Sequence, residues 1–453
     1  MLLRLKPLRV FLHSFKLISV FFLVALAIFG QAPTATTPAE ILFTNVRVFD
    51  GRSASLSALT SVLIRGNTIA AIGASAQSSN AKVIDGAGRT LMPGLIDAHA
   101  HMMFNSLSQF AIMSSDIGFV NLASGKAATA MLLRGYTSVR DLGGPSFGLK
   151  KAIDLDMVPG PRIWPSGAMI SQSGGHGDFR LPNELPAPPD SFAYSERVGA
   201  AEIADDPGTV RRRVREQLAL GASQIKLMAG GGVASPFDPI DVTQYTTEEI
   251  RAAVEAAANW GTYVTVHAYT PRAVGQAIDA GVKCIDHGQL LDDATAKLIA
   301  EKGIWWSLQP FTDDRPSAYA EGSPNRIKQL TMFKGTDTAY TLAKKYHIKT
   351  AWGTDILFSP ENLLTQTHML TKMVQWYTPA EVLKMATADN AELLALSGER
   401  SPYPGKLGVV ETGALADLLL VNGDPIANIN ILEDADKNLV VIMKDGKIFK
   451  NTL

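Results

Sequence analysis

Cysteine is nearly absent from this chain of 453 residues, which contains only Cys284. A single cysteine excludes an intrachain disulfide, so the fold depends on its hydrophobic core rather than on cross-links. Cys284 lies in an apolar run that starts at Val282, which predicts a buried strand residue. A reactive thiol, the alternative, would need an exposed and electropositive setting.

An excess of charge of one sign is also missing. The 42 lysines and arginines balance 43 aspartates and glutamates, which gives a formal net charge of −1. Proteins that bind nucleic acids usually carry a basic excess. We therefore expect no nucleic-acid partner.

Long hydrophobic runs are limited to one at the N-terminus, residues 17–29, which at about 13 residues is short of the ~20 that a membrane span needs. Basic residues precede it, and the small-residue segment Gly30-Gln31-Ala32 follows. This order is typical of an export signal. We predict a signal peptide at 1–32, an exported (periplasmic or extracellular) protein, and no stable membrane anchor after cleavage. An uncleaved anchor is the alternative. The basic residues are Arg4, Lys6, Arg9 and Lys16.

Both ends of the remaining chain are rich in β-type sequence. Residues 41–49 end at the turn dipeptide Asp50-Gly51, and residues 61–72 form a predicted hairpin around Gly66-Asn67. Residues 416–421 and 439–449 show the same pattern. We predict that 38–92 and 400–453 combine into a small β-sandwich domain.

The segment between them, 93–399, alternates short apolar strands with helical stretches such as 207–220 and 247–260. This α/β pattern predicts a (β/α)8 TIM barrel. The eight strand candidates lie around residues 95–98, 137–140, 162–165, 224–228, 263–266, 283–286, 304–308 and 350–353.

Ionisable residues stand at the carboxyl ends of these strands, where a barrel places its active site. His99 and His101 are two apart, so in an extended segment both imidazoles point to the same side and can bind one ion. His267 and His287 end two consecutive predicted strands. We interpret all four as metal ligands. The segment Pro93-Gly94-Leu95-Ile96-Asp97 immediately before the first pair favours this interpretation over a chance pair in a loop.

Lys226 interrupts an otherwise apolar strand, where a buried ammonium is costly. It either pairs with a carboxylate or, as we favour, has reacted with carbon dioxide to form a carbamate that offers one oxygen to each of two metals. Asp355 ends the last predicted strand. It is expected to ligate one ion, accept a proton from a metal-activated water and pass that proton to the leaving amine.

Taken in order, His99, His101, Lys226, His267, His287 and Asp355 resemble the binuclear ligand set of the amidohydrolase superfamily. Within it, the chain is most similar to the imidazolonepropionase-like and Xaa-Pro dipeptidase-like branch, through segments such as 138–144, 174–178, 226–232 and 267–270. The resemblance implies two divalent ions, most often zinc, with His99, His101 and Asp355 on the more buried one. It implies that His267 and His287 hold the other ion, that carboxylated Lys226 bridges the two, and that the chain forms a homo-oligomer.

Substrate contacts are predicted on the adjoining loops. His176, in a glycine-rich loop, is a candidate for stabilising a tetrahedral oxyanion. Tyr269 follows His267 and is a candidate for binding a substrate carboxylate or carbonyl. Arg272 either pairs with a carboxylate or faces solvent, and Arg180 is a weaker candidate of the same kind. The glycines at 230–232 lack the lysine and strand–loop–helix setting of a phosphate loop and are interpreted as room for substrate.

The expected activity is hydrolysis of an amide or peptide bond in a dipeptide or N-acyl L-amino acid. The branch includes zinc carboxypeptidases, dipeptidases and ochratoxin-hydrolysing amidases. Opening of a cyclic amide and deamination are the alternatives. Mononuclear deaminases do not need a bridging lysine, so Lys226 disfavours deamination. Ring-opening hydrolases keep this lysine, so that alternative stays open. A non-enzymatic binding protein would be expected to have lost ligands, and none of the six is missing here.

Signal cleavage is tested by the intact mass of the exported protein. We expect the mass to lack residues 1 to about 30, because the small residues that admit signal peptidase lie at 30–32. Secreted or periplasmic material with the full-length mass would contradict cleavage.

Overall fold

The computed structural model describes residues 38–187, 191–235 and 237–453, so the predicted signal peptide lies outside the described residues. Residues Glu40–Leu453 form one compact unit. No helix in the described ranges is long and apolar enough to cross a membrane.

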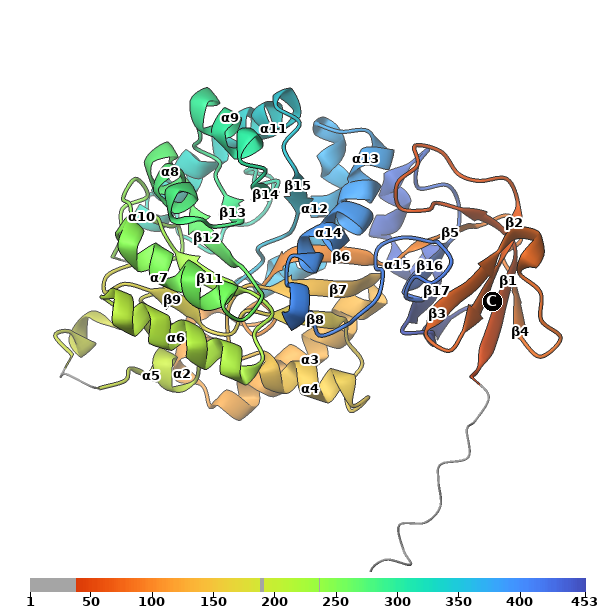
Figure 1. Cartoon of the computed structure of the whole chain (residues 1–453), viewed down its shortest axis with the longest axis horizontal. Coiled ribbons are helices and arrows are strands. Elements are labelled where there is room, and N and C mark those ends of the chain that lie inside the picture. Colours follow the sequence, from red (N-terminus) through yellow and green to blue (C-terminus); the bar gives the residue numbers. More distant parts are fainter. Residues whose placement is uncertain (1–37, 188–190, 236) are drawn as a thin grey trace, which may run out of the picture. The chain divides into compact units, whose positions relative to one another are not determined.

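Strands from both ends of the chain share one eight-stranded sheet, with the order β18-β17-β16-β5-β1-β2-β3 and with β4 beside β1. The two ends meet where β5 pairs antiparallel with β16, and in Figure 1 the strands of the N-terminal part lie beside those of the C-terminal part. The predicted pairing of the ends is therefore observed, whereas a sandwich of two stacked layers stays a prediction. The strands are β1 (Glu40–Val48), β2 (Thr60–Arg65), β3 (Thr68–Ile72), β4 (Lys82–Asp85), β5 (Thr90–Pro93), β16 (Leu418–Val421), β17 (Leu439–Lys444) and β18 (Lys447–Asn451).

The middle of the chain alternates parallel strands with helices, which confirms a mixed α/β fold. Its strands form a seven-stranded sheet, β10-β9-β11-β12-β13-β14-β15, and a three-stranded sheet, β6-β7-β8. They are β6 (Leu95–Ala100), β7 (Tyr136–Asp141), β8 (Arg162–Pro165), β9 (Met169–Ser171), β10 (Ala201–Ile203), β11 (Ile225–Met228), β12 (Val264–Ala268), β13 (Cys284–His287), β14 (Trp305–Leu308) and β15 (Thr350–Trp352).

Helices cover these parallel strands on the outside (Figure 1). The local sequence explains where several begin: Thr246 and Glu249 cap α7 reciprocally, and Thr270 caps α8 ahead of Pro271. The helices are α2 (Gln109–Ser114), α3 (Ile117–Leu133), α4 (Phe147–Asp154), α5 (Tyr194–Arg197), α6 (Pro207–Leu220), α7 (Thr247–Ala258), α8 (Pro271–Ala280), α9 (Asp293–Glu301), α10 (Pro324–Phe333), α11 (Thr336–Lys345), α12 (Gln366–Thr371), α13 (Pro379–Lys384), α14 (Asn390–Ala395) and α15 (Ala435–Asn438).

The described strands do not hydrogen-bond into one closed ring. Between β6 and β15 a side chain replaces the backbone ladder: the amide nitrogen of Asn390 donates to the carbonyls of Ile96 (2.7 Å) and Trp352 (2.8 Å). The amide oxygen of Asn390 also accepts from the backbone of Trp352 at 3.0 Å. The edges of the two parallel sheets are thus joined at this point through Asn390.

A buried ion pair connects the parallel strands to the end sheet. Arg162, on β8, donates to both carboxylate oxygens of Asp417 at 2.8 and 3.1 Å, and to Asp445 at 2.8 Å. Burial opposes the charge of Arg162, but these carboxylates raise its pKa above the ordinary value. The Arg162 and Asp417 side chains are only 7% and 2% exposed, so bulk water does not solvate either charge.

Replacing Asp417 by Ala leaves the Arg162 guanidinium buried with a weaker partner. We expect the free energy of unfolding to fall by about 3–5 kcal/mol, the usual cost of breaking a buried pair from one side. Urea unfolding measures the change. Glu301→Ala, which breaks the exposed pair with Lys297, is the control and should cost less than about 1 kcal/mol. Equal effects of the two variants would contradict a structural role for the Arg162 pair.

Candidate metal centre and active site

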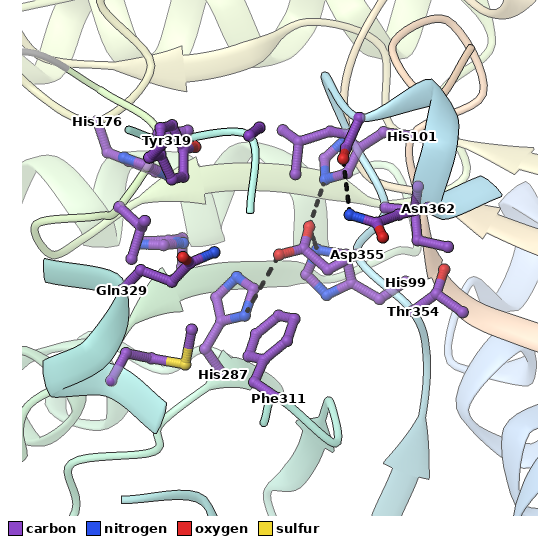
Figure 2. A pocket seen from close by; sticks show the side chains of 18 of the residues that line it. His99, His101, His176, His287, Phe311, Tyr319, Gln329, Thr354, Asp355 and Asn362 are labelled. Atoms are coloured by element: carbon purple, nitrogen blue, oxygen red, sulfur yellow. Dashed lines mark hydrogen bonds and ion pairs between the residues drawn. The ribbon is translucent and has the colours of Figure 1, made fainter. Parts of the chain in front are cut away.

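One cavity collects the ionisable residues that end the parallel strands. His99 and His101 stand at the end of β6, Lys226 lies on β11, and His267 and His287 lie on β12 and β13. Asp355 follows β15, and all six side chains line the cavity. In Figure 2, His101 and Asn362 face His176 and Tyr319 across the cavity, with Asp355 and His287 between them. The predicted ligand set is therefore brought together in space.

The tightest cluster is His99, His101 and Asp355, whose ligand atoms all lie within 4.8 Å of one another. The Asp355 carboxylate is 3.0 Å from Nε2 of His101 and 3.2 Å from Nε2 of His99, and 4.0 Å from Nδ1 of His287 (Figure 2). Nδ1 of His101 is buried and makes no hydrogen bond, and Nε2 of His99 is buried and meets the Asp355 carboxylate without hydrogen-bond geometry. Buried nitrogens without a hydrogen bond are costly, and imidazole nitrogens beside a carboxylate are suitable zinc ligands, so these residues fit a metal ion.

Local backbone geometry supports this cluster. Asp355 and His287 adopt positive φ angles of 51° and 77°, which are unusual for residues other than glycine and are often found at functional sites. A Cβ atom on Gly353 would lie 2.5 Å from the backbone nitrogen of His99. The glycine therefore allows the end of β15 to approach β6, and the backbone nitrogen of Asp355 donates to the carbonyl of His99 at 2.8 Å.

Burial sets the protonation of the histidines. It lowers the pKa of His99 to about 4 and holds the pKa values of His267 and His287 well below the ordinary one. Neutral imidazoles keep the lone pair that metal binding requires. Burial would raise the pKa of Asp355, but the neighbouring His99 and His101 rings hold it well below its ordinary value.

Lys226 is buried and donates to Asp286 at 2.7 Å. The carboxylate alternative considered from the sequence is thus present in this structure, and sequence analysis did not identify Asp286 as the partner. Burial lowers the pKa of Lys226 despite this contact. Burial would raise the pKa of Asp286, but Lys226 and Arg140 hold it far below its ordinary value. Asp286 directly precedes His287 at the end of an apolar strand, and this pair was the sequence signal that could have identified the partner of Lys226.

The predicted substrate contacts fare differently. His176 and Tyr269 line the cavity, and the His176 ring stacks on His267 with centroids 4.0 Å apart. Burial lowers the pKa of His176 to about 4. Arg272 is exposed on the first turn of α8 and does not line the cavity, and Arg180 is held away from it by both carboxylate oxygens of Asp178.

The glycine segment 230–232 makes room for protein atoms. A Cβ on Gly231 would lie 1.8 Å from the carbonyl oxygen of Pro239, and one on Gly232 would lie 2.0 Å from the His176 ring. The space at Gly232, which we interpreted as room for substrate, is thus occupied by a histidine of the cavity wall.

Cationic residues missed by sequence analysis come from the segment after β14. Arg315 and Arg326 line the cavity, together with Tyr319 and Gln329. Arg326 is neutralised by Asp313 at 2.6 Å. Arg315 donates from Nη1 to Thr365 and to the sulfur of Met369, while its buried Nε has no hydrogen-bond partner. The rule that a barrel's site follows its strand ends would have pointed to this segment.

Buried imidazoles, a carboxylate and a lysine at the carboxyl ends of parallel strands are typical of metal-dependent hydrolases with alternating strands and helices. The sequence model of the amidohydrolase family matches residues 90–449. The chain belongs to the amidohydrolase family and is a hydrolase that acts on amide bonds.

Similar proteins support this assignment. An ochratoxinase from Aspergillus niger is 31% identical over 378 residues, which cover 80% of this chain and 75% of the relative. The crystal structure of a prolidase in complex with N-methylphosphonate-L-proline matches with a TM-score of 0.83 and 35% identity, over 91% of this chain and 100% of that one. A Xaa-Pro dipeptidase with bound methionine matches with a TM-score of 0.77 and 28% identity, over 91% and 100%.

Proposed function

We propose that this chain is a binuclear metal-dependent amidohydrolase that cleaves the amide or peptide bond of a dipeptide or N-acyl L-amino acid. The convergence of four histidines, Lys226 and Asp355 on one cavity is the observation that carries this proposal. The ochratoxinase, prolidase and dipeptidase relatives support the substrate class, and ochratoxin-type amides belong to it.

The residues would hold two divalent ions, with zinc the best fit to imidazole and carboxylate ligands. His99, His101 and Asp355 would bind one ion, and His267 and His287 the other. Bound there, the ions would supply a nucleophilic water at neutral pH and polarise the scissile carbonyl. Lys226 would carry the carbamate that the family resemblance implies, and the lowering of its pKa by burial favours this reaction, because carbon dioxide reacts with the neutral amine.

Proton transfer is assigned to Asp355. Its lowered pKa keeps the carboxylate ionised at neutral pH, so it is available as a base beside the histidine cluster. It would accept a proton from the attacking water and deliver it to the leaving amine. Tyr269, buried in the cavity wall 4.9 Å from the His267 ring, is positioned to contact the substrate.

The cavity offers a contact for a substrate carboxylate that sequence analysis did not identify. Arg315 brings a guanidinium into the wall without a matched carboxylate: Asp314 is 3.7 Å from its Nε and is itself bound by Lys372 at 2.9 Å. Arg272 no longer qualifies, because it is exposed away from the cavity. We assign the carboxylate of the released or acylated amino acid to Arg315 and Tyr269.

The family resemblance also bears on the architecture of the chain and on its oligomeric state. We propose that the two parallel sheets are parts of a (β/α)8 barrel at 93–399 and that the end sheet is a β-sandwich. We also propose an exported homo-oligomer, as the N-terminal sequence and the family resemblance suggest.

Metal content tests the binuclear centre. We expect about two divalent ions per chain in protein prepared with zinc, because six ligand residues share one cavity. Lys226→Ala should lose about one ion and lower kcat by about 100-fold or more, while exposed Lys297→Ala should change neither. Elemental analysis and kinetics measure both. A metal-free wild type, or a fully metallated and active Lys226→Ala, would contradict the model.

A library of dipeptides, N-acyl amino acids and ochratoxin-type amides tests the activity. For good substrates, Arg315→Met should raise KM by about 10–100-fold, the value of a charge-assisted hydrogen bond. The same variant should leave KM unchanged for the matching C-terminal amides, which lack the carboxylate. Arg272→Met is the control. The absence of turnover across the library would contradict the proposed function, and equal effects on acids and amides would contradict the role of Arg315 alone.

A further inference from the structure

A buried polar network lies directly behind His176. Ser235, Asp238 and Gln244, which we call the Asp238 network, are 0%, 4% and 1% exposed. They belong to the connection between β11 and α7, after the Lys226 strand. None of them has a role in metal binding or proton transfer as described above, so their burial together calls for another explanation.

The network holds His176 at two points. Nδ1 of its ring is 2.7 Å from the Ser235 hydroxyl, which in turn bonds to Oδ1 of Asp238. The backbone nitrogen of His176 donates to the amide oxygen of Gln244 at 2.9 Å. The amide nitrogen of Gln244 donates to Oδ2 of Asp238 at 3.1 Å, so the two arms end on the same carboxylate.

Contacts on the ring itself complete this arrangement. Gly232 lies against the His176 ring so closely that a Cβ atom would be 2.0 Å from Nδ1 and Cε1, and its backbone nitrogen donates to Oδ2 of Asp238 at 2.7 Å. The His267 ring stacks on His176 at 4.0 Å. Nε2 of His176 makes no hydrogen bond within the described part of the chain, which leaves it for a ligand in the cavity.

Hydrogen counting fixes the tautomer of the ring. A carboxylate only accepts hydrogen bonds, so the single hydrogen of the Ser235 hydroxyl points to Asp238. The Ser235 oxygen therefore presents a lone pair to Nδ1 of His176, and that nitrogen must carry a hydrogen. The neutral ring then has its lone pair on Nε2.

We propose that Asp238 and Ser235 are positioning residues that orient His176 and keep its ring hydrogen on Nδ1, so that Nε2 presents a lone pair to the substrate and accepts a hydrogen bond from it. In this tautomer His176 has no hydrogen to donate to an oxyanion, so this acceptor role replaces the oxyanion role predicted from the sequence. The consequence for catalysis rests on the proposed function. The relay resembles in logic the carboxylate that orients a histidine in hydrolytic triads, with a serine hydroxyl inserted between the two.

Asp238→Asn gives a sharp test because its outcome is dictated by geometry. Oδ2 of Asp238 receives two N–H donors, from Gly232 and Gln244, so the oxygen of the new amide must stay at that position. The amide nitrogen then faces Ser235 and donates to it. The Ser235 hydrogen turns towards Nδ1 of His176, and the ring hydrogen moves to Nε2.

Nitrogen-15 NMR of histidine-labelled, metal-loaded protein reads the tautomer without any substrate. His287 should also give an Nδ1–H signal, because its Nδ1 lies 2.8 Å from the amide oxygen of Gln309, so the His176 signal is assigned as the one that disappears in His176→Gln. In Asp238→Asn the hydrogen should be found on Nε2. In Ser235→Ala the hydrogen-bonded Nδ1–H signal should be lost, and Ser235→Thr should restore it, because threonine keeps the hydroxyl.

Kinetics on a substrate from the library then separates positioning from general stability. We expect Asp238→Asn and Ser235→Ala to lower kcat about tenfold or more with a smaller change in KM and with unchanged metal content, while Ser235→Thr recovers the wild-type kcat, because Nε2 can accept a hydrogen from the substrate only while the ring hydrogen stays on Nδ1. Ser53→Ala is the matched control, because it removes another serine–aspartate bond between residues three apart, in an exposed turn with Asp50. It should have no effect.

Retention of the His176 Nδ1–H signal in Asp238→Asn, or a wild-type signal and kcat in Ser235→Ala, would overturn the relay. Failure of the proposed function has a different signature: no library compound is turned over, while the NMR spectra still decide where His176 carries its hydrogen.

Discussion

The carboxylate of Asp286 is the contact on which the interior of the parallel strands depends. It is fully buried and accepts from Arg140 on β7, Lys226 on β11 and Thr265 on β12, each at 2.7 Å. Arg140 also donates to the carbonyl of Ala98 on β6 at 2.6 Å. One side chain on β13 therefore ties together strands of both parallel sheets.

Buried charges are expensive to remove from water, and the attraction between Arg140 and Asp286 offsets this cost only where the geometry is well matched. Such a network contributes more to defining one arrangement than to stability. Here the arrangement that it defines is the position of Lys226, and through the strand register also that of His267, which lies opposite Asp286 in the β12–β13 pair. The same dry surroundings keep the histidines neutral and able to bind metal.

Sequence analysis located the parts of the site that depend on short-range periodicity. The His99 and His101 pair, Lys226 and Asp355 could be placed because strand ends and two-residue alternation are visible in the sequence. Of the two readings of Arg272, the solvent-facing one is observed, because Pro271 starts α8 at once and leaves the next side chain in solvent. Ser235 and Asp238 were missed because they belong to an irregular segment, whose path depends on contacts distant in sequence. The strand-end rule indicates the segment of Arg315 but not which of its side chains enters the cavity. The Asn390 bridge between β6 and β15 has no local signal either.

Gly232 shows how the two kinds of information combine. From sequence alone, the three consecutive glycines after the Lys226 strand are interpreted as room for substrate. The structure places the His176 ring, which comes from the segment after β9, in that space. A residue with a side chain at 232 would displace His176 and also disturb the bond from its own backbone nitrogen to Asp238. The glycine therefore acts on the cavity indirectly, because it allows the ring and the carboxylate that orients it to occupy adjacent space. Loops that follow different strands are in this way coupled at one position, so a change in either loop alters the group that the cavity presents to its substrate.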